Sequence, residues 1–540
     1  MREPSISQYR SEIERLYANS EVIPEDYDGA TPETALHSPS LDDSTRLVRH
    51  HVRAVTGWES LTDDEIFFDR GMDSLQGLQL VRALRGAFHR HDFALSTVYQ
   101  NPTVSQLTRA IVHRNDDNAQ DERKVMQTLL DTYRRLIQQI EIPKSSVIYD
   151  DKGSKTVNVM LTGSTGTIGT HLLRALLRND GVGRVFCVNR GEDGGQASQY
   201  SGFIDNGYDP GALDNRVTFI KADLQQPLLG LYHPTYESLR KQVGLIVHAA
   251  WPVNFNLALS AFRPQFAAVV NLLAFAANAS SKFVFVSSVA AVGGSASGPP
   301  REEVLEDFDI PSPFGYGRAK FIAEVLVDTA AQHFKGLLPT AILRVGQVAG
   351  PVNRHDAGLW NPKEWFPSMV LSSLHLGQVP DNLGPFDEID FIPVDILADV
   401  VVQLATAAAS TEGISDRATV FNIRNPHPTR WKELLPAIVN AGGSPPQVVL
   451  PETWLAALRA SVDADYDDDD VSQINPAVKL IGFFSRLWTA ESSDLSAQEK
   501  SNRMSIDRAL AESVHLRELK PVGLAWMNKW VGQWVKIRDG

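Results

Sequence analysis

The sequence predicts an α/β protein in which an N-terminal four-helix bundle precedes a parallel, doubly wound sheet and a smaller C-terminal domain. Three observations lead to this prediction. Residues 44–111 carry apolar residues at helical spacing. Residues 157–170 read VNVMLTGSTGTIGT, an apolar run that stops at glycines where a helical pattern begins. Helical patterns then alternate with apolar strand-like runs, as in a parallel sheet, at residues 184–188, 217–220, 245–248, 283–286 and 340–345.

Composition limits the classes of function. The 540 residues carry a net charge of -14, whereas nucleic-acid binding needs clustered Lys and Arg. The single cysteine, Cys187, cannot form an internal disulfide, which favours a reducing compartment. The longest apolar run, residues 266–279, is too short to span a bilayer, and the N-terminus lacks the apolar core of a signal peptide. We expect a cytoplasmic monomer with no membrane or nucleic-acid partner.

Capping residues mark the helices of the bundle. Ser44 is the expected N-cap of the first helix, Ser74 follows Asp73 at the start of the second, and Thr103 opens a capping box before the third. A short helical pattern at residues 6–17 and a Pro- and Ser-rich linker precede the bundle. The apolar residues expected on the inward faces are Val48, Val52, Val55, Leu78, Val81, Leu84, Phe88, Val104, Leu107 and Ile111.

Two segments of the bundle resemble a known family. FFDRGMDSLQGLQLVRALR, followed by VYQNPTVSQLTRAI, is similar to an acyl or peptidyl carrier domain. In that family the serine of the GMDSL-type motif carries 4′-phosphopantetheine, so the resemblance implies that Ser74 is the attachment site. The alternative is a capped helix in an ordinary bundle.

The patterns divide the chain into parts. The polar segment NDDNAQDER, residues 115–123, is expected to be a linker before a helix over residues 125–140. The expected parts are residues 1–40, a helix and linker; 41–115, the carrier domain; 116–152, linker and helix; 153–350, the cofactor-binding part; and 351–540, mainly a substrate-binding part, from which residues 391–410 return to the cofactor-binding part.

The glycines after the first strand indicate a dinucleotide site. Gly163 would permit the turn, Gly166 would let a pyrophosphate approach the backbone, and Gly169 would let helix and strand pack closely. The N-terminus of the following helix favours an anionic phosphate. A glycine-containing turn that binds nothing is the alternative.

The end of the second strand, VFCVNRG, indicates which dinucleotide binds. An acidic residue here would contact the adenosine ribose, whereas an arginine accommodates a 2′-phosphate. Asn189 and Arg190 occupy this place, so we predict NADPH. The alternative is that Arg190 is a surface charge at a strand end.

A tyrosine and a lysine form the expected catalytic pair. Tyr316 and Lys320 are four residues apart and share one face of a helix. Reduction by hydride needs a proton donor and a group that stabilises the oxyanion. We expect Lys320 and the positive nicotinamide ring to lower the pKa of Tyr316, the acid. Ser287 or Ser288, at the end of a buried strand, would hydrogen-bond the oxyanion, unless both serines make only local hydrogen bonds.

These features resemble the extended short-chain dehydrogenases, whose NADP-binding part is a Rossmann domain. In that family the catalytic serine or threonine lies five residues before the glycine of the next turn, here Gly293, which implies Ser288. The pair Asp223 and Leu224 resembles the residues that contact adenine. The catalytic residues that we assign are Ser288, Tyr316 and Lys320. The cofactor-binding residues that we assign are Gly163, Thr165, Gly166, Thr167, Ile168, Gly169, Arg190, Asp223, Leu224, Ala249, Tyr316 and Lys320.

Three further segments are similar to the thioester reductase branch of this superfamily: VHAAWPVNFN, LRVGQVAGP and FIPVDILADVV. Together with the carrier they resemble the end of a nonribosomal-peptide-synthetase-like carboxylic acid reductase. The resemblance implies NADPH-dependent release of an acyl thioester as an aldehyde, with an alcohol after a second reduction. It also implies an upstream adenylation domain and a phosphopantetheinyl transferase as partners. The segment after Arg190, GEDGGQASQYSGF, carries fewer arginines than such reductases often do.

Two other functions remain open: a redox-inactive domain that releases or cyclises a carrier-bound chain, and a carrier fused to a nucleotide-sensing scaffold. Tyr316 and Lys320 favour the reductase over both. We predict a solvated loop rather than a metal site for the acidic run at residues 463–470. We expect Trp526, Trp530 and Trp534 to dock the terminal helix. Trp360, Trp365 and Phe366 are expected mainly to fill the core of the substrate-binding part.

Overall fold

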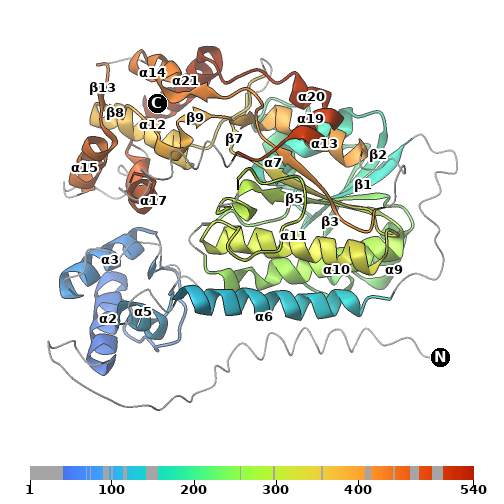
Figure 1. Cartoon of the computed structure of the whole chain (residues 1–540), viewed down its shortest axis with the longest axis horizontal. Helices are drawn as coiled ribbons and strands as arrows, with labels where there is room; N and C mark the ends of the chain where they lie inside the picture. Colours follow the sequence, from blue (N-terminus) through green and yellow to red (C-terminus); the bar gives the residue numbers. More distant parts are fainter. Residues whose placement is uncertain are drawn as a thin grey trace.

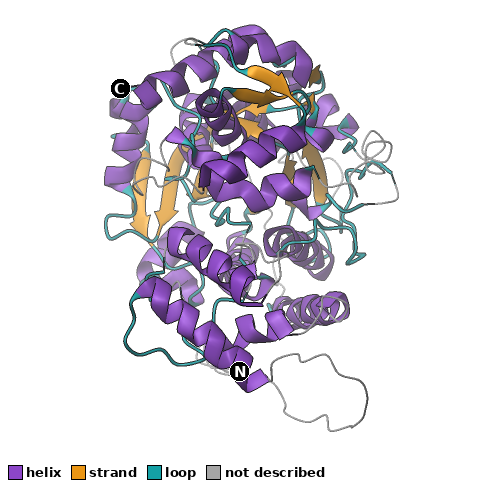
Figure 2. Ribbon diagram, turned by 90° about the vertical axis from the view of Figure 1, so that its left-hand side faces the viewer, coloured by secondary structure: helices purple, strands orange, loops and turns teal. Residues whose placement is uncertain are grey.

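The computed structural model describes most of the chain beyond residue 40. The described residues are 41–67, 70–72, 74–88, 97–98, 101–112, 118–141, 156–255, 257–295, 298–353, 357–407, 415–441, 444–462, 474–488 and 503–539. An N-terminal helical bundle lies beside a larger body that contains the strands (Figures 1 and 2). The predicted helix at residues 6–17 and the acidic run at residues 463–470 lie outside the described residues.

The N-terminal bundle contains α2 (Leu41–Thr56), α3 (Ser74–Phe88) and α5 (Val104–Val112). Its buried core includes Val48, Val52, Val81, Leu84, Val104, Leu107 and Ile111, all predicted to face inward, together with Phe67, Met72, Leu80 and Val98. The prediction that Ser44 caps α2 is wrong, because the helix begins three residues earlier, at Leu41, and Ser44 is buried inside it. The Thr103 cap is confirmed, since its Oγ1 accepts a hydrogen bond from the Gln106 amide at 3.2 Å.

A long helix, α6 (Asn118–Gln138), lies along the base of the larger body (Figure 1). It begins before residue 125, so the linker predicted over residues 115–123 is wrong from residue 118 onward. Contacts with the larger body explain the early start: Glu122 forms an ion pair with Arg318, and Arg123 forms one with Asp309. Along the rest of the helix, an apolar face enters the main core: Met126, Leu129, Leu130, Tyr133, Leu136 and Ile137.

A seven-stranded parallel sheet forms the centre of the larger body. Its spatial order is β11-β6-β5-β4-β1-β2-β3, and every neighbouring pair is parallel. The strands are β1 (Val157–Thr162), β2 (Val182–Asn189), β3 (Val217–Lys221), β4 (Leu245–His248), β5 (Lys282–Ser288), β6 (Thr340–Val345) and β11 (Thr419–Ile423). The predicted doubly wound sheet is confirmed, and β11 is an additional strand that we did not predict.

Helices cover both faces of this sheet. On one face, α9 (His233–Arg240), α10 (Arg263–Ala279) and α11 (Gly315–His333) share a core with α6. The opposite face is covered by α7 (Thr167–Arg178), α8 (Gln196–Asp205), α13 (Val394–Ala407), α19 (Asp507–Glu512) and α20 (Val514–Arg517). Thus β11, α19 and α20 also belong to the sheet domain, in addition to the residues 391–410 expected to return to it.

A smaller lobe has a core of its own, in which Trp360, Phe366, Trp431, Trp454, Trp530 and Trp534 are buried. Its helices are α12 (Trp365–Leu376), α14 (Trp431–Val439), α15 (Pro451–Val462), the 3-10 helix η8 (Pro476–Leu480), α17 (Ile481–Leu487) and α21 (Leu524–Asp539). Short paired strands accompany them: β7 (Val348–Ala349) with β10 (Ile392–Pro393), β8 (Gln378–Pro380) with β13 (Gln447–Val449), and β9 (Glu388–Ile389) with β12 (Thr429–Arg430). The predicted docking of α21 by its tryptophans is therefore confirmed.

One contact relates the N-terminal bundle to the smaller lobe, because helix α3 of the bundle contacts η8 of that lobe.

Within the described residues, the helical segment Leu259–Ala279 is long and apolar enough to cross a membrane, but 61% of its most apolar 18-residue stretch is buried inside the protein. That burial is explained by the position of α10 against the sheet.

Candidate active site

The predicted cofactor residues lie at the carboxyl ends of four adjacent strands. In the sheet, β2 and β3 lie on one side of β1, and β4, β5, β6 and β11 lie on the other, so the strand order reverses direction at β1. Ligands of open α/β sheets bind in the crevice at such a switch point. The glycine turn after β1, Arg190 after β2, Asp223 after β3 and Ala249 after β4 all border this edge.

The glycine turn has the geometry that its spacing predicts. Gly163 has φ 72°, and a Cβ there would lie 2.7 Å from Ala250 Cα. A Cβ on Gly169 would lie 2.7 Å from Ser164 Cα and would collide with the Gly163 carbonyl oxygen. A Cβ on Gly166 would lie no closer than 3.6 Å to another residue, at the Gly163 carbonyl oxygen, so the backbone at Gly166 stays open to a ligand. The turn, the open backbone and the close packing correspond to the three glycines in the expected order.

The start of α7 suits a phosphate group. Gly166 is the N-cap of α7, and since it has no side chain it cannot cap the first amides of the helix, which can then donate to a ligand. Thr165, Gly166 and Thr167 are exposed, and Ile168 is half-buried. These residues therefore fit a pyrophosphate, because their backbone amides can donate hydrogen bonds and are accessible to a ligand.

The end of β2 contacts the glycine turn directly. Asn189 Nδ2 donates to Ser164 Oγ at 2.9 Å and to the Gly194 carbonyl at 2.8 Å. Arg190 is the next residue, and its side chain is exposed. Asn189 thus holds the loop, while Arg190 remains accessible at the edge of the crevice.

The remaining cofactor candidates are partly buried. The Asp223 amide donates to the Leu229 carbonyl at 3.0 Å, which folds the loop after β3 back on itself. Leu224 packs against the main core, and its carbonyl accepts a hydrogen bond from Asn271 Nδ2 at 2.9 Å. The Ala249 amide donates to the Thr162 carbonyl at 3.3 Å and joins β4 to β1.

The three catalytic candidates come together at the end of β5. Tyr316 lies in the first turn of α11, is 6% exposed, and has its hydroxyl in hydrogen-bond contact with Ser288. Ser288 ends β5, and its Oγ also accepts from the Ala290 amide at 3.2 Å. By contrast, the Ser287 hydroxyl donates to Glu324 Oε1 at 2.5 Å. The geometry therefore favours Ser288, rather than Ser287, as the partner of Tyr316.

Lys320 lies beneath this pair in an aromatic setting. Its Nζ donates to the Val286 carbonyl at 2.7 Å and lies 4.3 Å from the centre of the Trp251 ring and 4.5 Å from that of Phe285. The same nitrogen is 5.9 Å from the centre of the Tyr316 ring. Such positions over aromatic faces stabilise a buried cation.

One electrostatic prediction differs from the structure. We expected Lys320 to lower the pKa of Tyr316, whereas burial raises the pKa of Tyr316 to about 12, and the Ser288 hydrogen bond offsets this only in part. The reason is that the phenol is desolvated, while the Lys320 nitrogen is directed at a carbonyl of β5. Tyr316 is therefore protonated at neutral pH, which is the form that a proton donor requires.

The sequence did not indicate the aromatic residues around Tyr316. The Phe255 ring lies edge-on to Tyr316 with 5.2 Å between ring centres, and the Phe314 ring stacks at 6.5 Å. Phe255 is 48% exposed, so it borders the solvent side of the site. Its position within WPVNFN, directly after a strand that ends at the crevice, was the available signal.

Ser74 is the first residue of α3, as predicted. Its neighbour Asp73, which we expected to cap the helix, lies outside the described residues.

Comparison with known proteins identifies both parts of the chain. Residues 46–111 match the phosphopantetheine attachment site family. Residues 161–401 match the male sterility protein family, an NAD-binding family. The chain therefore combines a segment that matches phosphopantetheine attachment domains with a longer segment that matches an NAD-binding family.

Relatives along the whole chain narrow this class. A carboxylic acid reductase of Neurospora crassa is 30% identical over 99% of this chain and 50% of its own length. An adenylate-forming reductase of Heterobasidion annosum is 26% identical over 99% of this chain and 49% of its own length. The chain thus spans about half the length of these relatives.

Solved structures agree on the fold. A thiolation-reductase di-domain from an archaeal nonribosomal peptide synthetase aligns with a TM-score of 0.63 and 17% identity, covering 95% of this chain and 100% of that one. The terminal reductase domain of the myxalamid pathway aligns with a TM-score of 0.59 and 21% identity over 75% of this chain and 98% of that one. The chain is therefore similar along nearly its whole length to a carboxylic acid reductase and an adenylate-forming reductase, and it has the fold of a thiolation-reductase di-domain.

Proposed function

We propose that this chain reduces an acyl group held as a thioester on the phosphopantetheine of Ser74, using NADPH, and releases it as an aldehyde. The observation that carries the proposal is the meeting of Tyr316, Ser288 and Lys320 at the end of β5, on the sheet whose strand β1 leads into the glycine turn, in one chain with a segment that matches carrier domains. The reaction converts the thioester, NADPH and a proton into the aldehyde, the free thiol and NADP⁺. A second round of hydride and proton transfer would give an alcohol.

The residues of this chain supply the proton and the charge stabilisation. NADPH, when bound at the glycine turn, supplies the hydride. Tyr316 donates a proton toward the carbonyl oxygen, and Ser288 donates a second hydrogen bond to the same oxygen. Tyr316 and Lys320 are 6% and 3% exposed, and a surrounding of low dielectric constant strengthens hydrogen bonds to such groups. Lys320 in its ammonium form would place a positive charge near the developing oxyanion.

The choice of NADPH rests on Arg190. Its exposed guanidinium follows β2 at the place where a 2′-phosphate would lie, and Asn189, rather than a carboxylate, occupies the preceding position. The exposed amides at the start of α7 would hold the pyrophosphate.

The carrier sets the partners that we propose. A phosphopantetheinyl transferase would modify Ser74, and an adenylation domain would load the thiol. Attachment raises the effective concentration of the acyl group at the reductase without strong binding of the free acid. We propose a cytoplasmic monomer as the working form.

Loading of the holo protein with an acyl group tests the proposal directly. We expect NADPH absorbance to fall in step with the appearance of aldehyde, and an unmodified carrier to give neither signal. Release of a cyclised or hydrolysed product without NADPH consumption would instead identify a redox-inactive domain. Parallel measurements with NADH determine the cofactor preference.

A further inference from the structure

A buried ion pair lies directly behind the catalytic residues. Glu324 is one helical turn beyond Lys320 on α11, and its carboxylate accepts from Arg344 Nη2 at 2.6 Å and from Arg344 Nε at 2.9 Å. The exposed fractions of the two side chains are 2% for Glu324 and 0% for Arg344. Two charges this deeply buried are costly to desolvate, so their presence calls for an explanation beyond stability.

The same carboxylate is bonded to the catalytic strand. Ser287 Oγ donates to Glu324 Oε1 at 2.5 Å, and Ser287 directly precedes Ser288. One residue earlier, the Val286 carbonyl accepts the hydrogen bond from Lys320. Helix α11 is therefore fixed to β5 at two consecutive residues, and these fix the distance between Tyr316 and Ser288.

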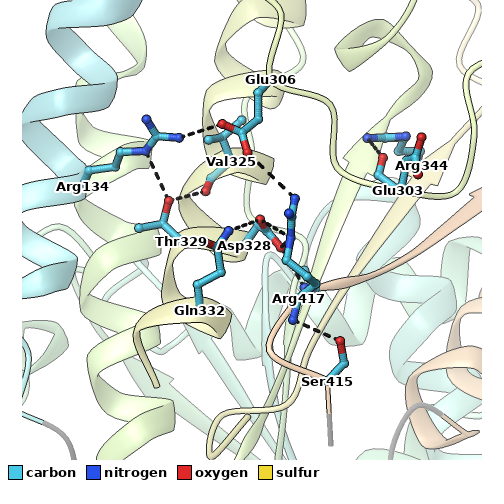
Figure 3. Close-up of polar contacts among 11 residues, drawn as sticks. Arg134, Glu303, Glu306, Val325, Asp328, Thr329, Gln332, Arg344, Ser415 and Arg417 are labelled. Carbon is cyan, nitrogen blue, oxygen red and sulfur yellow. Dashed lines mark hydrogen bonds and ion pairs between the residues drawn. The ribbon is translucent and has the colours of Figure 1, made fainter. Parts of the chain in front are cut away.

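Arg344 extends the network to the next strand and to a loop. It comes from β6, and its guanidinium also donates to the Arg301 carbonyl at 3.0 Å. A further hydrogen bond runs from Arg344 to the Glu303 carbonyl at 2.9 Å (Figure 3). The Arg344 guanidinium thus donates to the Glu324 carboxylate and to two backbone carbonyls.

We propose that Glu324 is a positioning residue for the reduction: it holds α11 in register with β5 and keeps Lys320 in its ammonium form. This inference rests on the proposed function and adds to it a residue that touches neither substrate nor cofactor.

The charges around Lys320 support the second role. Burial lowers the pKa of Lys320 well below its usual value, and the carboxylate of Glu324 opposes this shift in part. The other titratable groups that face it are Tyr316 on α11 and His248 on β4, while Arg344 on β6 is paired with Glu324. Burial lowers the pKa of His248 to about 3, so its ring is neutral. Among the described groups around Lys320, Glu324 is therefore the one that favours its positive charge.

The chain offers a matched control on the same helix. Asp328 lies one turn beyond Glu324, is 1% exposed, and accepts from Arg417 Nε at 3.0 Å and from the Ala418 amide at 2.9 Å (Figure 3). It is eight residues from Lys320, about 12 Å along the helix. Asp328→Asn therefore disturbs a buried carboxylate and arginine contact without reaching the site.

The experiment compares the pH profile of turnover in the holo chain loaded with one acyl group. In Glu324→Gln we expect the alkaline limb to move to lower pH by about one unit, because Lys320 loses its proton more readily. Glu324→Asp retains the charge and should restore the limb. Ser287→Ala should lower turnover by about tenfold with the limb unmoved, since only the register is affected. Asp328→Asn should match the unmodified sequence.

The outcomes separate the two proposals. A Glu324→Gln profile that superimposes on that of Asp328→Asn overturns the positioning role. Failure of the unmodified holo chain to consume NADPH overturns the proposed function instead. If Glu324→Gln does not fold, Ser287→Ala decides the register role, and turnover of Ser287→Ala equal to that of Asp328→Asn overturns it.

Discussion

Replacement of Tyr316 by Phe removes one hydroxyl from a buried ring and tests the proton donor. The Ser288 hydroxyl keeps its contact with the Ala290 amide, so the variant should lose only about 1 kcal/mol of folding free energy. The ring itself keeps its packing against Phe255 and Phe314. Loss of a positioned acid should lower turnover by about 10²–10⁴-fold, because Ser288 alone would stabilise the oxyanion.

The assay is NADPH consumption by the acyl-loaded holo chain, with NADPH binding measured separately by fluorescence. Tyr236→Phe is the matched control: Tyr236 is 7% exposed, burial raises its pKa to about 12, and it lies on α9 against Phe275. We expect the control to keep full turnover and Tyr316→Phe to keep NADPH binding. Turnover of Tyr316→Phe within threefold of the control, about 0.7 kcal/mol, would falsify the assignment of the acid.

Three further predictions follow from the same contacts. Ser74→Ala should abolish reduction of carrier-loaded substrate but retain reduction of a free acyl-pantetheine thioester; loss of both activities contradicts the attachment role. Arg190→Ala should raise the KM for NADPH about tenfold or more and leave that for NADH unchanged; equal changes would make Arg190 a surface charge. Gly169→Ala should lower Tm and NADPH affinity because its Cβ collides with the turn, whereas Gly532→Ala on α21, where a Cβ meets nothing within 4 Å, should raise stability by up to about 1 kcal/mol.

Local chain geometry explains why the glycine turn could be predicted. The positive φ at Gly163 and the close contact at Gly169 arise within a few residues, so their spacing in the sequence carries the information. The helix that presents Tyr316 and Lys320 on one face is similarly local. The choice of Ser288 needed a family resemblance, because the contact that occupies Ser287 comes from Glu324, 37 residues away.

Properties that depend on distant segments were not accessible in this way. Burial raises the pKa of Tyr316, and part of the packing around its ring comes from Phe255, which precedes β5 in the sequence. Strand β11 is only five residues long, and a segment that includes α12 and α13 separates it in the sequence from β6, the strand with which it pairs. The start of α6 depends on ion pairs with residues near 310–318, and its polar first turn resembles a linker when viewed alone.

The attachment of α6 to the reductase limits how far the carrier can travel. Because α6 is packed into the main core and Glu122 and Arg123 near its start form ion pairs with the larger body, the start of α6 is a fixed point on that body. The six residue-to-residue steps from Val112 to Asn118 span at most about 20 Å. The end of α5 therefore stays within that radius of one fixed point on the reductase throughout the catalytic cycle. Any loading enzyme must bring its own site into that small volume, and lengthening this segment would slow the transfer between loading and reduction rather than the chemistry itself.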